Sequence, residues 1–383
     1  MRKISVIGGA GHIGLPFSCF MQNKGYKVTI VDTDTIALDI IKSGNTPFIE
    51  EGLESELIKA IDNGLEFDTS LNKSNDSDYL IITIGTSSKK EDIILFREVI
   101  NELSENSKKD SFFILRSTID LESYEFVITH ENIINKGIKV AYCPERIAEG
   151  KALEEIESLP QIIGVKNDSE YKIFSNFFND LKIDTIKTSI EDSIFIKLFT
   201  NAYRYASFNL INEFSNIAIE NGLDFETLYD VARSEYPRLE NSPLTGMVGG
   251  PCLPKDFETF QNSYGDNRNL LSQLSRSESL FLENVVANCK REFLDKKIIQ
   301  LGVSFKSNSD DLRTSSSLKL YNQLTDNGFE VFIVDPWIKP SVDLNVFEYN
   351  TIKDKTENVL IATNHDIFKD YNLENKNVIK VGY

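Results

Sequence analysis

The chain has 383 residues, of which 41% are hydrophobic and 26% are charged, a composition typical of a globular protein rather than a disordered or fibrous one. At ~150 residues per domain, this length predicts two or three domains. The formal net charge of −18 argues against nucleic acid or an anionic membrane as the main partner, because either would require a basic face.

The first elements predict one βαβ unit at the N-terminus. Residues 3–8 are a short apolar run typical of a buried parallel strand, and residues 15–25 have helical spacing closed by Gly25. Residues 26–32 predict a second strand that ends at Asp32. No cleavage site follows this apolar start, so we expect neither a signal peptide nor a membrane span.

Further apolar runs alternate with helical stretches and extend a parallel α/β sheet; they cover residues 78–85, 111–118 and 138–144. The character changes at Ser189, where more than thirty residues lack Gly and Pro before Gly222. Ser189 with Asp192 predicts a capping box at the start of one long helix. This helix is apolar on much of its circumference, so we expect it to pack against both flanking domains or another subunit. Helical segments then continue to about residue 290.

The last part of the chain repeats the pattern of the first. Residues 296–306, 315–328 and 329–336 predict strand, helix and strand, and "DNGFEVFIVD" closely matches "NKGYKVTIVD" of the first unit. The second unit lacks a glycine fingerprint, so we expect it to hold something other than a dinucleotide pyrophosphate. The predicted fold class is therefore α/β, with two Rossmann-like, doubly wound parallel-sheet domains joined by a long central helix.

The glycine loop between the first predicted strand and the first predicted helix matches a dinucleotide-binding fingerprint. "GAGHIG" matches G-x-G-x-x-G: Gly9 permits a tight turn, Gly11 lets the backbone approach a pyrophosphate, and Gly14 lets helix and strand pack. Asp32 would bind the ribose hydroxyls and repel a 2′-phosphate, which favours NAD over NADP. The alternative is a purely structural turn.

A second candidate is the cysteine loop "VGGPCLPKDF". Its glycines, Gly249 and Gly250, would let a ligand approach the backbone, and two prolines stiffen the loop around Cys252. Lys255 and Asp256 supply a cation and a candidate base, and nearby positive charge favours a nucleophilic thiolate. A buried structural thiol is the alternative, and we expect that role for Cys19, Cys143 and Cys289. The four cysteines show neither CxxC nor metal-ligand spacing, so we expect no metal and a reducing cytoplasmic location.

Two further patterns place polar groups where they could contact a ligand. Glu145 and Glu149 follow a predicted strand, at the sheet edge where α/β proteins bind ligands. Lys197 and Asn201 lie four apart, and so on one face of the long helix. Taken singly, these residues are more simply explained as solvated loop carboxylates and a lysine that extends to solvent.

Together these residues resemble the UDP-glucose/GDP-mannose dehydrogenase family, the NAD-dependent nucleotide-sugar 6-dehydrogenases. The resemblance rests on "GAGHIGLP", "RST", "CPERIAEG", "KLFTN", "GGPCLPKD", "FKSNSDDLRTSS" and "IATNHDIF", in that order along the chain. It implies an NAD-binding domain at 1–188, a helical dimerisation domain at 189–292 and a UDP-binding domain at 293–383. It also implies a UDP-sugar substrate, a homodimer, and a uronic acid product for surface polysaccharides.

The family chemistry oxidises the C6 alcohol of the sugar to a carboxylate by two hydride transfers to two NAD molecules. Cys252 would add to the aldehyde and form a thiohemiacetal, and then a thioester that water hydrolyses. The resemblance implies these catalytic residues: Cys252, Lys197 as an oxyanion stabiliser, Asn201 as its partner, Asp256 and Thr118 as water-positioning groups, and Glu145 as the base. The cofactor would contact Gly9, Gly11, His12, Ile13, Gly14, Asp32, Thr86, Thr118, Glu149 and Arg313. The substrate would contact Glu145, Arg146, Lys197, Asn201, Gly249, Lys255 and Lys306, with Arg238 reaching the partner subunit's sugar.

Two features bear on the details. His12 stands where the family often has a tyrosine; it could lie against the pyrophosphate, but a surface-exposed histidine is the simpler expectation, and Gly8 is an extra glycine before the loop. Arg146 in "CPERIAEG" resembles enzymes of UDP-N-acetylhexosamines, particularly UDP-N-acetylmannosamine, whereas "GGPCLPKD" is closer to the UDP-glucose enzymes. The rival hypotheses are a two-electron hydroxyacid dehydrogenase, which would not need Cys252, and an inactive NAD-binding sensor.

Overall fold

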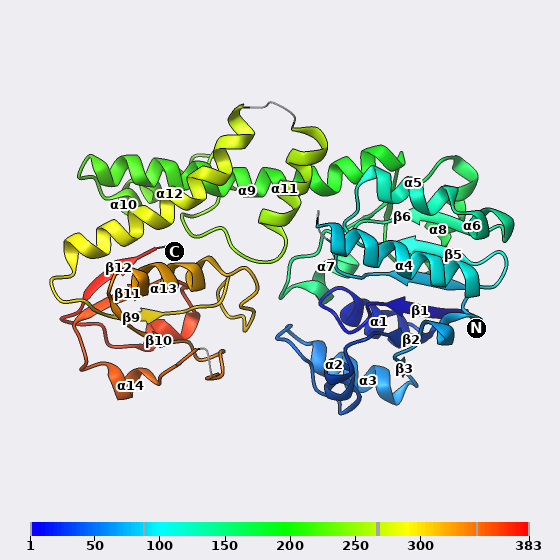
Figure 1. Ribbon diagram of the computed structural model, residues 1–383, viewed down its shortest axis with the longest axis horizontal. Helices are drawn as coiled ribbons and strands as arrows, with labels where there is room; N and C mark the ends of the chain where they lie inside the picture. Colours follow the sequence, from blue (N-terminus) through cyan, green and yellow to red (C-terminus); the bar gives the residue numbers. More distant parts are fainter. Residues whose placement is uncertain (1, 87–88, 266–268, 342–343, 382–383) are drawn as a thin grey trace. The chain divides into compact units, whose positions relative to one another are not determined.

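The computed structural model describes residues 2–86, 89–265, 269–341 and 344–381. The chain forms two compact units, residues 1–200 and 201–383, which we call the N-terminal unit and the C-terminal unit (Figure 1). Among the described residues, no helix combines the length and the apolar character needed to cross a membrane. The division into three domains at residues 188 and 292 stays a prediction.

The N-terminal unit is built on an eight-stranded sheet in the order β3-β2-β1-β4-β5-β6-β7-β8. All neighbouring strands are parallel except β6 and β7, which pair antiparallel through Tyr142 and Gly164. The strands are β1 (Lys3–Ile7), β2 (Lys27–Val31), β3 (Glu66–Asp68), β4 (Tyr79–Ile82), β5 (Phe112–Leu115), β6 (Lys139–Tyr142), β7 (Gln161–Gly164) and β8 (Thr185–Thr188). The five predicted strands are confirmed as β1, β2, β4, β5 and β6.

Helices connect these strands and cover the sheet (Figure 1). They are α1 (Gly14–Asn23), α2 (Thr35–Lys42), α3 (Leu53–Asp62), α4 (Lys90–Asn106), α5 (Leu121–Thr129), α6 (Glu131–Asn135), α7 (Ala152–Ser158) and α8 (Asp168–Asp180), with a 3₁₀ turn η1 (Leu71–Ser74). Helix α1 is buried at nine of its ten residues, because it packs on β2, α3 and α7. The glycine loop that precedes α1 is therefore anchored to the core of this unit.

Helix α9 (Ile190–Glu220) begins in the N-terminal unit and continues in the C-terminal unit. As predicted, Ser189 caps its start: the Oγ atom accepts the backbone N–H of Asp192 at 3.0 Å. The helix ends before Gly222, whose φ of +70° is favourable for glycine. The predicted long helix is thus confirmed at both ends.

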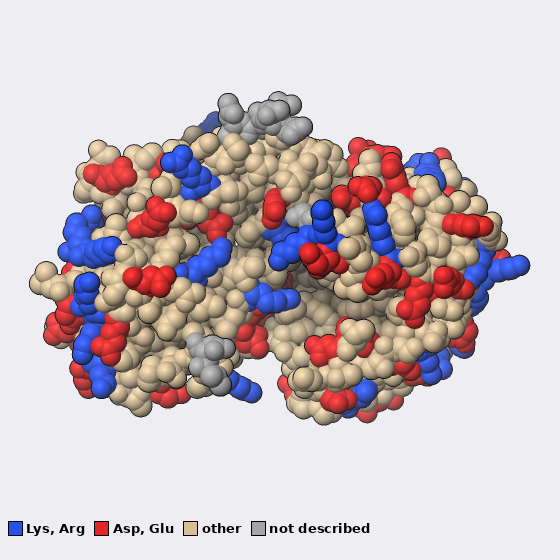
Figure 2. All heavy atoms as spheres, viewed as in Figure 1, with Lys and Arg blue, Asp and Glu red and all other residues tan. Residues whose placement is uncertain are grey.

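The C-terminal unit contains a second, fully parallel sheet in the order β10-β9-β11-β12. Its elements are α10 (Phe225–Arg233), α11 (Leu253–Tyr264), α12 (Asn269–Glu292), β9 (Lys297–Leu301), α13 (Ser316–Asp326), β10 (Glu330–Val334), α14 (Tyr349–Ile352), β11 (Asn358–Ile361), η2 (Asp366–Asp370) and β12 (Asn377–Lys380). The β9-α13-β10 unit confirms the predicted repeat, and the fold class is confirmed as α/β with two parallel-sheet domains. On the face drawn in Figure 2, Lys and Arg side chains lie among Asp and Glu side chains on both units.

Candidate active site

The glycine loop after β1 is shaped by contacts that leave no room for side chains at three positions. Gly8 has a φ of +77°, and a Cβ atom there would lie 2.9 Å from the backbone nitrogen of Ile84. A Cβ atom at Gly9 would lie 2.8 Å from the Val6 carbonyl oxygen, and one at Gly14 would lie 2.6 Å from Cα of Gly9. These contacts explain the extra glycine at position 8, which the fingerprint does not require.

Gly11 differs from the other loop glycines because it is exposed. A Cβ atom there would meet only the Gly8 carbonyl oxygen, at an ordinary contact distance of 3.6 Å. The protein itself therefore does not require glycine at this position, and a ligand that approaches the backbone would. Ile13, half-buried, is the residue that precedes α1.

Asp32 follows β2 and is tied to the same loop. One carboxylate oxygen accepts the backbone N–H of Ala10 at 2.9 Å, and the other accepts that of Asp34 at 3.0 Å. The side chain is half-buried, with its orientation set by these two bonds. The structure thus brings the predicted ribose ligand directly beside the predicted pyrophosphate loop.

His12 does not lie exposed on the surface as the simpler expectation had it. Its ring stacks on Phe48, with centroids 3.9 Å apart, and its Nδ1 atom lies 4.0 Å from a carboxylate oxygen of Glu149. The side chain is 22% exposed. The partner ring comes from the segment between α2 and α3, which offers no local signal that it would reach the fingerprint.

Thr86 and Thr118 lie at the same edge of the sheet as the glycine loop. They follow β4 and β5, whose carboxyl ends meet at the edge where β1 and β2 also end. The hydroxyl of Thr86 donates a hydrogen bond to the backbone carbonyl of Thr118. The two residues predicted to contact the cofactor from separate strands are therefore neighbours.

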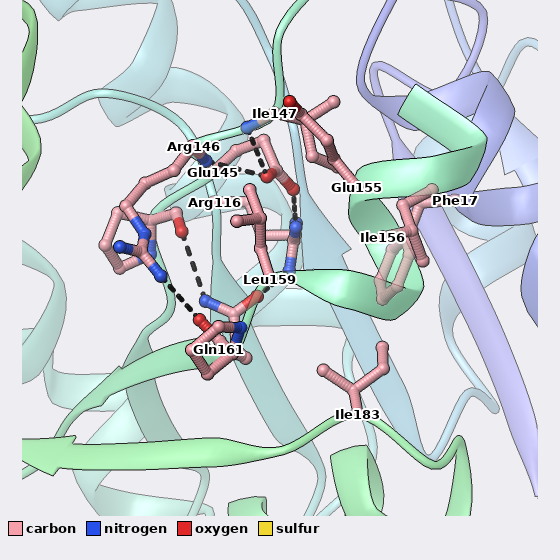
Figure 3. Close-up of a pocket in the computed structure, with 12 residues that line it drawn as sticks. Phe17, Arg116, Glu145, Arg146, Ile147, Glu155, Ile156, Leu159, Gln161 and Ile183 are labelled. Carbon is pink, nitrogen blue, oxygen red and sulfur yellow. Dashed lines mark hydrogen bonds and ion pairs between the residues drawn. The ribbon is translucent and has the colours of Figure 1, made fainter. Parts of the chain in front are cut away.

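Glu145 follows β6 at this edge and is buried rather than open to solvent; Figure 3 shows its contacts. One oxygen accepts the backbone N–H groups of Arg146 (2.7 Å) and Ile147 (2.9 Å), and the other pairs with the guanidinium of Arg116. These contacts occupy most of the acceptor capacity of the carboxylate. They favour a role in holding the loop, while its role as a base stays a prediction.

Arg116 is the partner that sequence reasoning missed, although the "RST" motif contains it. It is buried, donates to Gln161 Oε1 at 2.7 Å, and its guanidinium lies 4.4 Å from the centroid of the Phe17 ring. Burial lowers the pKa of Arg116 to about 10, so the group remains charged at neutral pH. The buried Arg116–Glu145 ion pair therefore links the ends of β5 and β6, and the hydrogen bond to Gln161 connects it to β7.

Two more residues hold the loop that carries Glu149. Arg146 is half-buried; it donates to the carbonyl of Pro160 at 2.6 Å, and burial lowers the pKa of its guanidinium. Glu50, also missed by sequence reasoning, accepts the backbone N–H groups of Gly150 and Ala152, both at 2.7 Å. Substrate contact by Arg146 stays a prediction. In the structure, the Arg146 guanidinium binds the backbone of its own chain (Figure 3).

In the C-terminal unit, Cys252 is set apart from the other three cysteines. It is exposed and immediately precedes α11, where the positive end of the helix dipole stabilises an anion. Cys19, Cys143 and Cys289 are buried as predicted, and burial raises the pKa of each to about 12. Those three thiols stay protonated at neutral pH.

Asn201 and Asp256 form the polar centre beside this thiol loop. The Asn201 amide donates to Asp256 Oδ2 at 2.6 Å, and Lys255 Nζ lies 3.5 Å from the other oxygen. Asp256 is buried, and Tyr205 stacked on Phe257 at 4.5 Å packs α11 against α9. This packing fixes the amide and the carboxylate relative to each other.

The glycines of the thiol loop are predicted to let a ligand approach the backbone, but protein atoms occupy the space beside them. A Cβ atom at Gly250, where φ is +92°, would lie 2.6 Å from the ring of Phe305, and one at Gly249 would lie 3.1 Å from the backbone nitrogen of Ser316. The glycines therefore admit Phe305 and the start of α13. Ligand approach at Gly249 stays a prediction.

The remaining predicted residues have varied settings. Lys197 is half-buried on α9, four residues before Asn201 on the same helix face. Lys306 is half-buried beside the Phe305 ring, and exposed Arg313 pairs with Asp311, with Nη2 and Oδ2 at 2.5 Å. Arg238 is exposed and lies over the Tyr236 ring. Lys197 belongs to the N-terminal unit, and Lys306, Arg313 and Arg238 belong to the C-terminal unit.

We expect one fast-reacting thiol per native chain. Ellman's reagent should modify Cys252 within minutes, since it is exposed, whereas Cys19, Cys143 and Cys289 are buried and should react only after denaturation. The Cys252→Ser variant should show no fast phase. A fast phase that persists in this variant would contradict the described burial.

Comparison with known proteins assigns the chain to a family. Three domains of the UDP-glucose/GDP-mannose dehydrogenase family match it: the NAD binding domain at residues 2–182, the central domain at 191–277 and the UDP binding domain at 300–380. The chain is 28% identical to the UDP-N-acetyl-D-mannosamine dehydrogenase of Methanococcus vannielii, over 98% of this chain and 88% of that protein. It is 27% identical to the UDP-glucose 6-dehydrogenase YwqF of Bacillus subtilis, over 87% and 79% of the two chains.

A solved structure agrees with this assignment. The UDP-N-acetyl-mannosamine dehydrogenase Cap5O of Staphylococcus aureus superposes with a TM-score of 0.85 at 25% identity, covering 99% of this chain and 94% of that one. The NAD-binding domain matches the part that carries the glycine loop and Asp32, and the UDP-binding domain matches the second sheet. The protein belongs to the UDP-glucose/GDP-mannose dehydrogenase family, a family of NAD-dependent nucleotide-sugar dehydrogenases.

Proposed function

We propose that the protein oxidises C6 of a UDP-N-acetylhexosamine, best matched by UDP-N-acetyl-D-mannosamine, from the alcohol to the uronate. The observation that carries this proposal is the setting of Cys252: one exposed thiol at the start of α11, beside the buried Asn201–Asp256 pair, in a chain whose other thiols are buried. A thiol so placed suits covalent capture of an aldehyde. A two-electron hydroxyacid dehydrogenase would have no use for it.

The residues at the edge of the first sheet fit NAD. Gly11 leaves the backbone open to a pyrophosphate, and Asp32, held by Ala10, would take the ribose hydroxyls. Thr86, Thr118, His12 and Glu149 lie at or near the same edge, and Arg313 is proposed as a further cofactor contact. NAD, when bound, accepts the hydride that each oxidation releases.

The overall reaction consumes one alcohol, two NAD⁺ and one water, and yields one carboxylate, two NADH and three protons. After the first oxidation, the Cys252 thiolate adds to the aldehyde carbon and forms a C–S bond. The second hydride leaves from this thiohemiacetal and gives a thioester. Water then cleaves the C–S bond and returns the thiolate.

The chain's polar residues supply the other roles in this scheme. Lys197 and Asn201 would stabilise the oxyanion that forms at C6, a role worth about 2.7–4 kcal/mol of barrier per donor in comparable sites. Asp256, fixed by Asn201 and close to Lys255, would position the hydrolytic water together with Thr118. Glu145 would act as the base for that water, which requires its ion pair with Arg116 to open during turnover. Lys306 and Gly249 would contact the substrate. A working thiolate requires a reducing compartment, which agrees with the cytoplasm, and the uronate would serve surface polysaccharide synthesis.

A comparison of kcat/KM among UDP-sugars identifies which sugar the enzyme prefers. The purified protein with NAD should show its highest kcat/KM with UDP-N-acetylmannosamine among four sugars, the others being UDP-N-acetylglucosamine, UDP-N-acetylgalactosamine and UDP-glucose. The expectation of UDP-N-acetylmannosamine rests on the similarity to UDP-N-acetyl-D-mannosamine dehydrogenases and on Arg146 in "CPERIAEG". Highest kcat/KM with UDP-glucose would instead support the alternative that the match to YwqF and the "GGPCLPKD" loop suggest.

A homodimer is proposed from the surface of α9. Six large apolar residues are exposed along a single face of this helix, namely Phe195, Phe199, Tyr203, Leu210, Phe214 and Ile217. Such a stripe is typical of an interface with a second subunit. The exposed Arg238 would then be available to reach the partner subunit's sugar.

The dimer predicts a selective effect of charge on this stripe. Phe214→Glu, at a residue 49% exposed in the chain, should shift the protein from dimer to monomer, because the interface would have to bury an unpaired carboxylate. Sedimentation velocity measures the change. Ile219→Glu is the matched control, since Ile219 is 44% exposed on the opposite face of α9 and should leave the dimer intact. A wild-type monomer would refute the dimer.

A further inference from the structure

A buried His–Asp pair lies at the carboxyl edge of the sheet in the C-terminal unit, in the segments that follow β10 and β11. His365 is fully buried, Asp335 is 2% exposed, and His365 Nε2 lies 3.1 Å from Asp335 Oδ2. The other ring nitrogen, Nδ1, accepts the backbone N–H of Asn308 at 2.8 Å. Because Nδ1 is an acceptor, the neutral ring carries its proton on Nε2 and donates it to Asp335.

Asp335 is the internal counterpart of Asp32. Each follows the second strand of a βαβ unit, and each accepts backbone N–H groups from the loop after the first strand: Asp32 from Ala10, and Asp335 from Val303 (2.9 Å) and Ser304 (3.3 Å). The two differ in exposure, since Asp32 is half-buried and Asp335 is enclosed. The position predicted to bind a ribose in the N-terminal unit is therefore enclosed in the protein interior in the C-terminal unit.

The pair fixes the loop that carries Lys306 on both sides of that residue. Val303 and Ser304 precede it and donate to Asp335, while Asn308 follows it and donates to His365. Ser304 Oγ also donates to the carbonyl of Lys306 at 2.9 Å. Asn308 has a φ of +55°, a conformation that its bonds to His365 and to Asp366 maintain.

The same loop supports the thiol loop. Phe305 is the residue whose ring fills the space beside Gly250, and the backbone N–H of Gly250 donates to the carbonyl of Thr314 at 3.3 Å. A displacement of residues 303–308 would therefore move two things, the Lys306 side chain and the surface against which the segment before Cys252 packs. The buried pair therefore contributes to the position of both, together with the bond from the Phe305 N–H to the Asp311 carbonyl at 3.1 Å.

We infer that His365 is a positioning residue for this enzyme: through Asn308 and Asp335 it holds Lys306 and Phe305 in place for the UDP-sugar and the thiol loop. This inference rests on the proposed function for the role of Lys306. It assigns no contact between His365 and the substrate, from which full burial separates it. Its effect is on affinity and geometry, and the chemistry belongs to Cys252.

The two ring nitrogens can be tested separately with the full chain. His365→Gln keeps a donor at the level of Nε2 but loses the acceptor for Asn308, whereas His365→Asn keeps an oxygen at the level of Nδ1. We expect His365→Gln to raise the KM for the UDP-sugar and the Kd for UDP about tenfold, as loss of a buried hydrogen bond allows. The KM for NAD should stay unchanged, and His365→Asn should recover most of the loss.

A control separates positioning from general destabilisation. Asn358, 3% exposed, begins β11 at the opposite end of the same sheet and donates to Asp295 Oδ1 at 2.7 Å. Asn358→Ala should lower the Tm without raising the KM for the UDP-sugar. If His365→Gln bound UDP and used the sugar as the wild type does, or if Asn358→Ala raised the KM equally, the inference would be overturned.

The outcomes also separate this inference from the proposed function. A wild-type chain that binds UDP but oxidises no UDP-sugar would end the proposed function, and the UDP affinities of the two His365 variants would still decide the inference. Full turnover in the wild type with equal UDP affinities in all variants would end the inference alone.

Discussion

Replacing Cys252 by alanine should reduce the formation of uronate by at least about 10³-fold, the order of loss seen when a covalent nucleophile is removed. The reason is the second oxidation, because the trigonal carbon of a free aldehyde is a poor hydride donor. Addition of the thiolate makes this carbon tetrahedral, and its oxygen can then re-form a carbonyl as the hydride leaves and the thioester forms. Binding of NAD and UDP should be unchanged, because Cys252 is an exposed residue ahead of α11 and alanine is smaller than the residue it replaces. Steady-state product analysis by chromatography measures the loss.

Cys289→Ala is the matched control for this variant. Cys289 lies in the same unit and is buried, and burial raises its pKa to about 12, so it has no part in nucleophilic chemistry. We expect activity within a few-fold of wild type and a modest loss of stability from the small cavity. Uronate formation by Cys252→Ala at more than a tenth of the wild-type rate would show that the thiol loop has another purpose.

The second large effect concerns alanine substitutions at two glycines of the loop after β1: one should weaken NAD binding and the other should lower stability. Gly11→Ala should fold normally, because its Cβ atom has 3.6 Å to the nearest protein atom, yet it should raise the Kd for NAD at least about tenfold by obstructing the pyrophosphate. Gly14→Ala should destabilise the protein by about 1–3 kcal/mol, because its Cβ atom would lie 2.6 Å from backbone atoms of Gly8 and Gly9.

Thermal unfolding and calorimetric titration with NAD distinguish the two variants. Gly11→Ala should keep the wild-type Tm and lose affinity, whereas Gly14→Ala should lose several degrees of Tm. Wild-type affinity in Gly11→Ala would mean that the loop is a structural turn, the alternative that the sequence alone leaves open.

The elements that the sequence predicted share strong local signals. Strands β1 and β2 are apolar runs flanked by glycine, and α9 has a capping serine at one end and Gly222 at the other. Two of the missed strands lack such signals: β3 has only three residues, and β8, at the edge of the sheet, reads "TIKT", with one apolar residue and no buried position. The antiparallel pairing of β7 was also beyond prediction, because pairing direction depends on chain path rather than composition.

For the site, motifs identified residue types and positions but not their partners. The pairs Glu145–Arg116, Glu50–Gly150 and Gly250–Phe305 each join segments about 30 to 100 residues apart, and no local pattern encodes such contacts. Glu145 illustrates the consequence: its place after β6 suggested an accessible base, whereas its neighbours make it the buried partner of an arginine. A motif therefore locates the edge of the sheet, and packing decides which side chain remains accessible.

The number of NADH molecules formed per UDP-sugar consumed tests the central claim most directly. Purified protein, excess NAD and a limiting amount of UDP-N-acetylmannosamine should yield two NADH per sugar, with the uronate as the final product. One NADH per sugar, with an aldehyde or ketone as the product, would contradict the proposal that Cys252 carries the intermediate through a second oxidation.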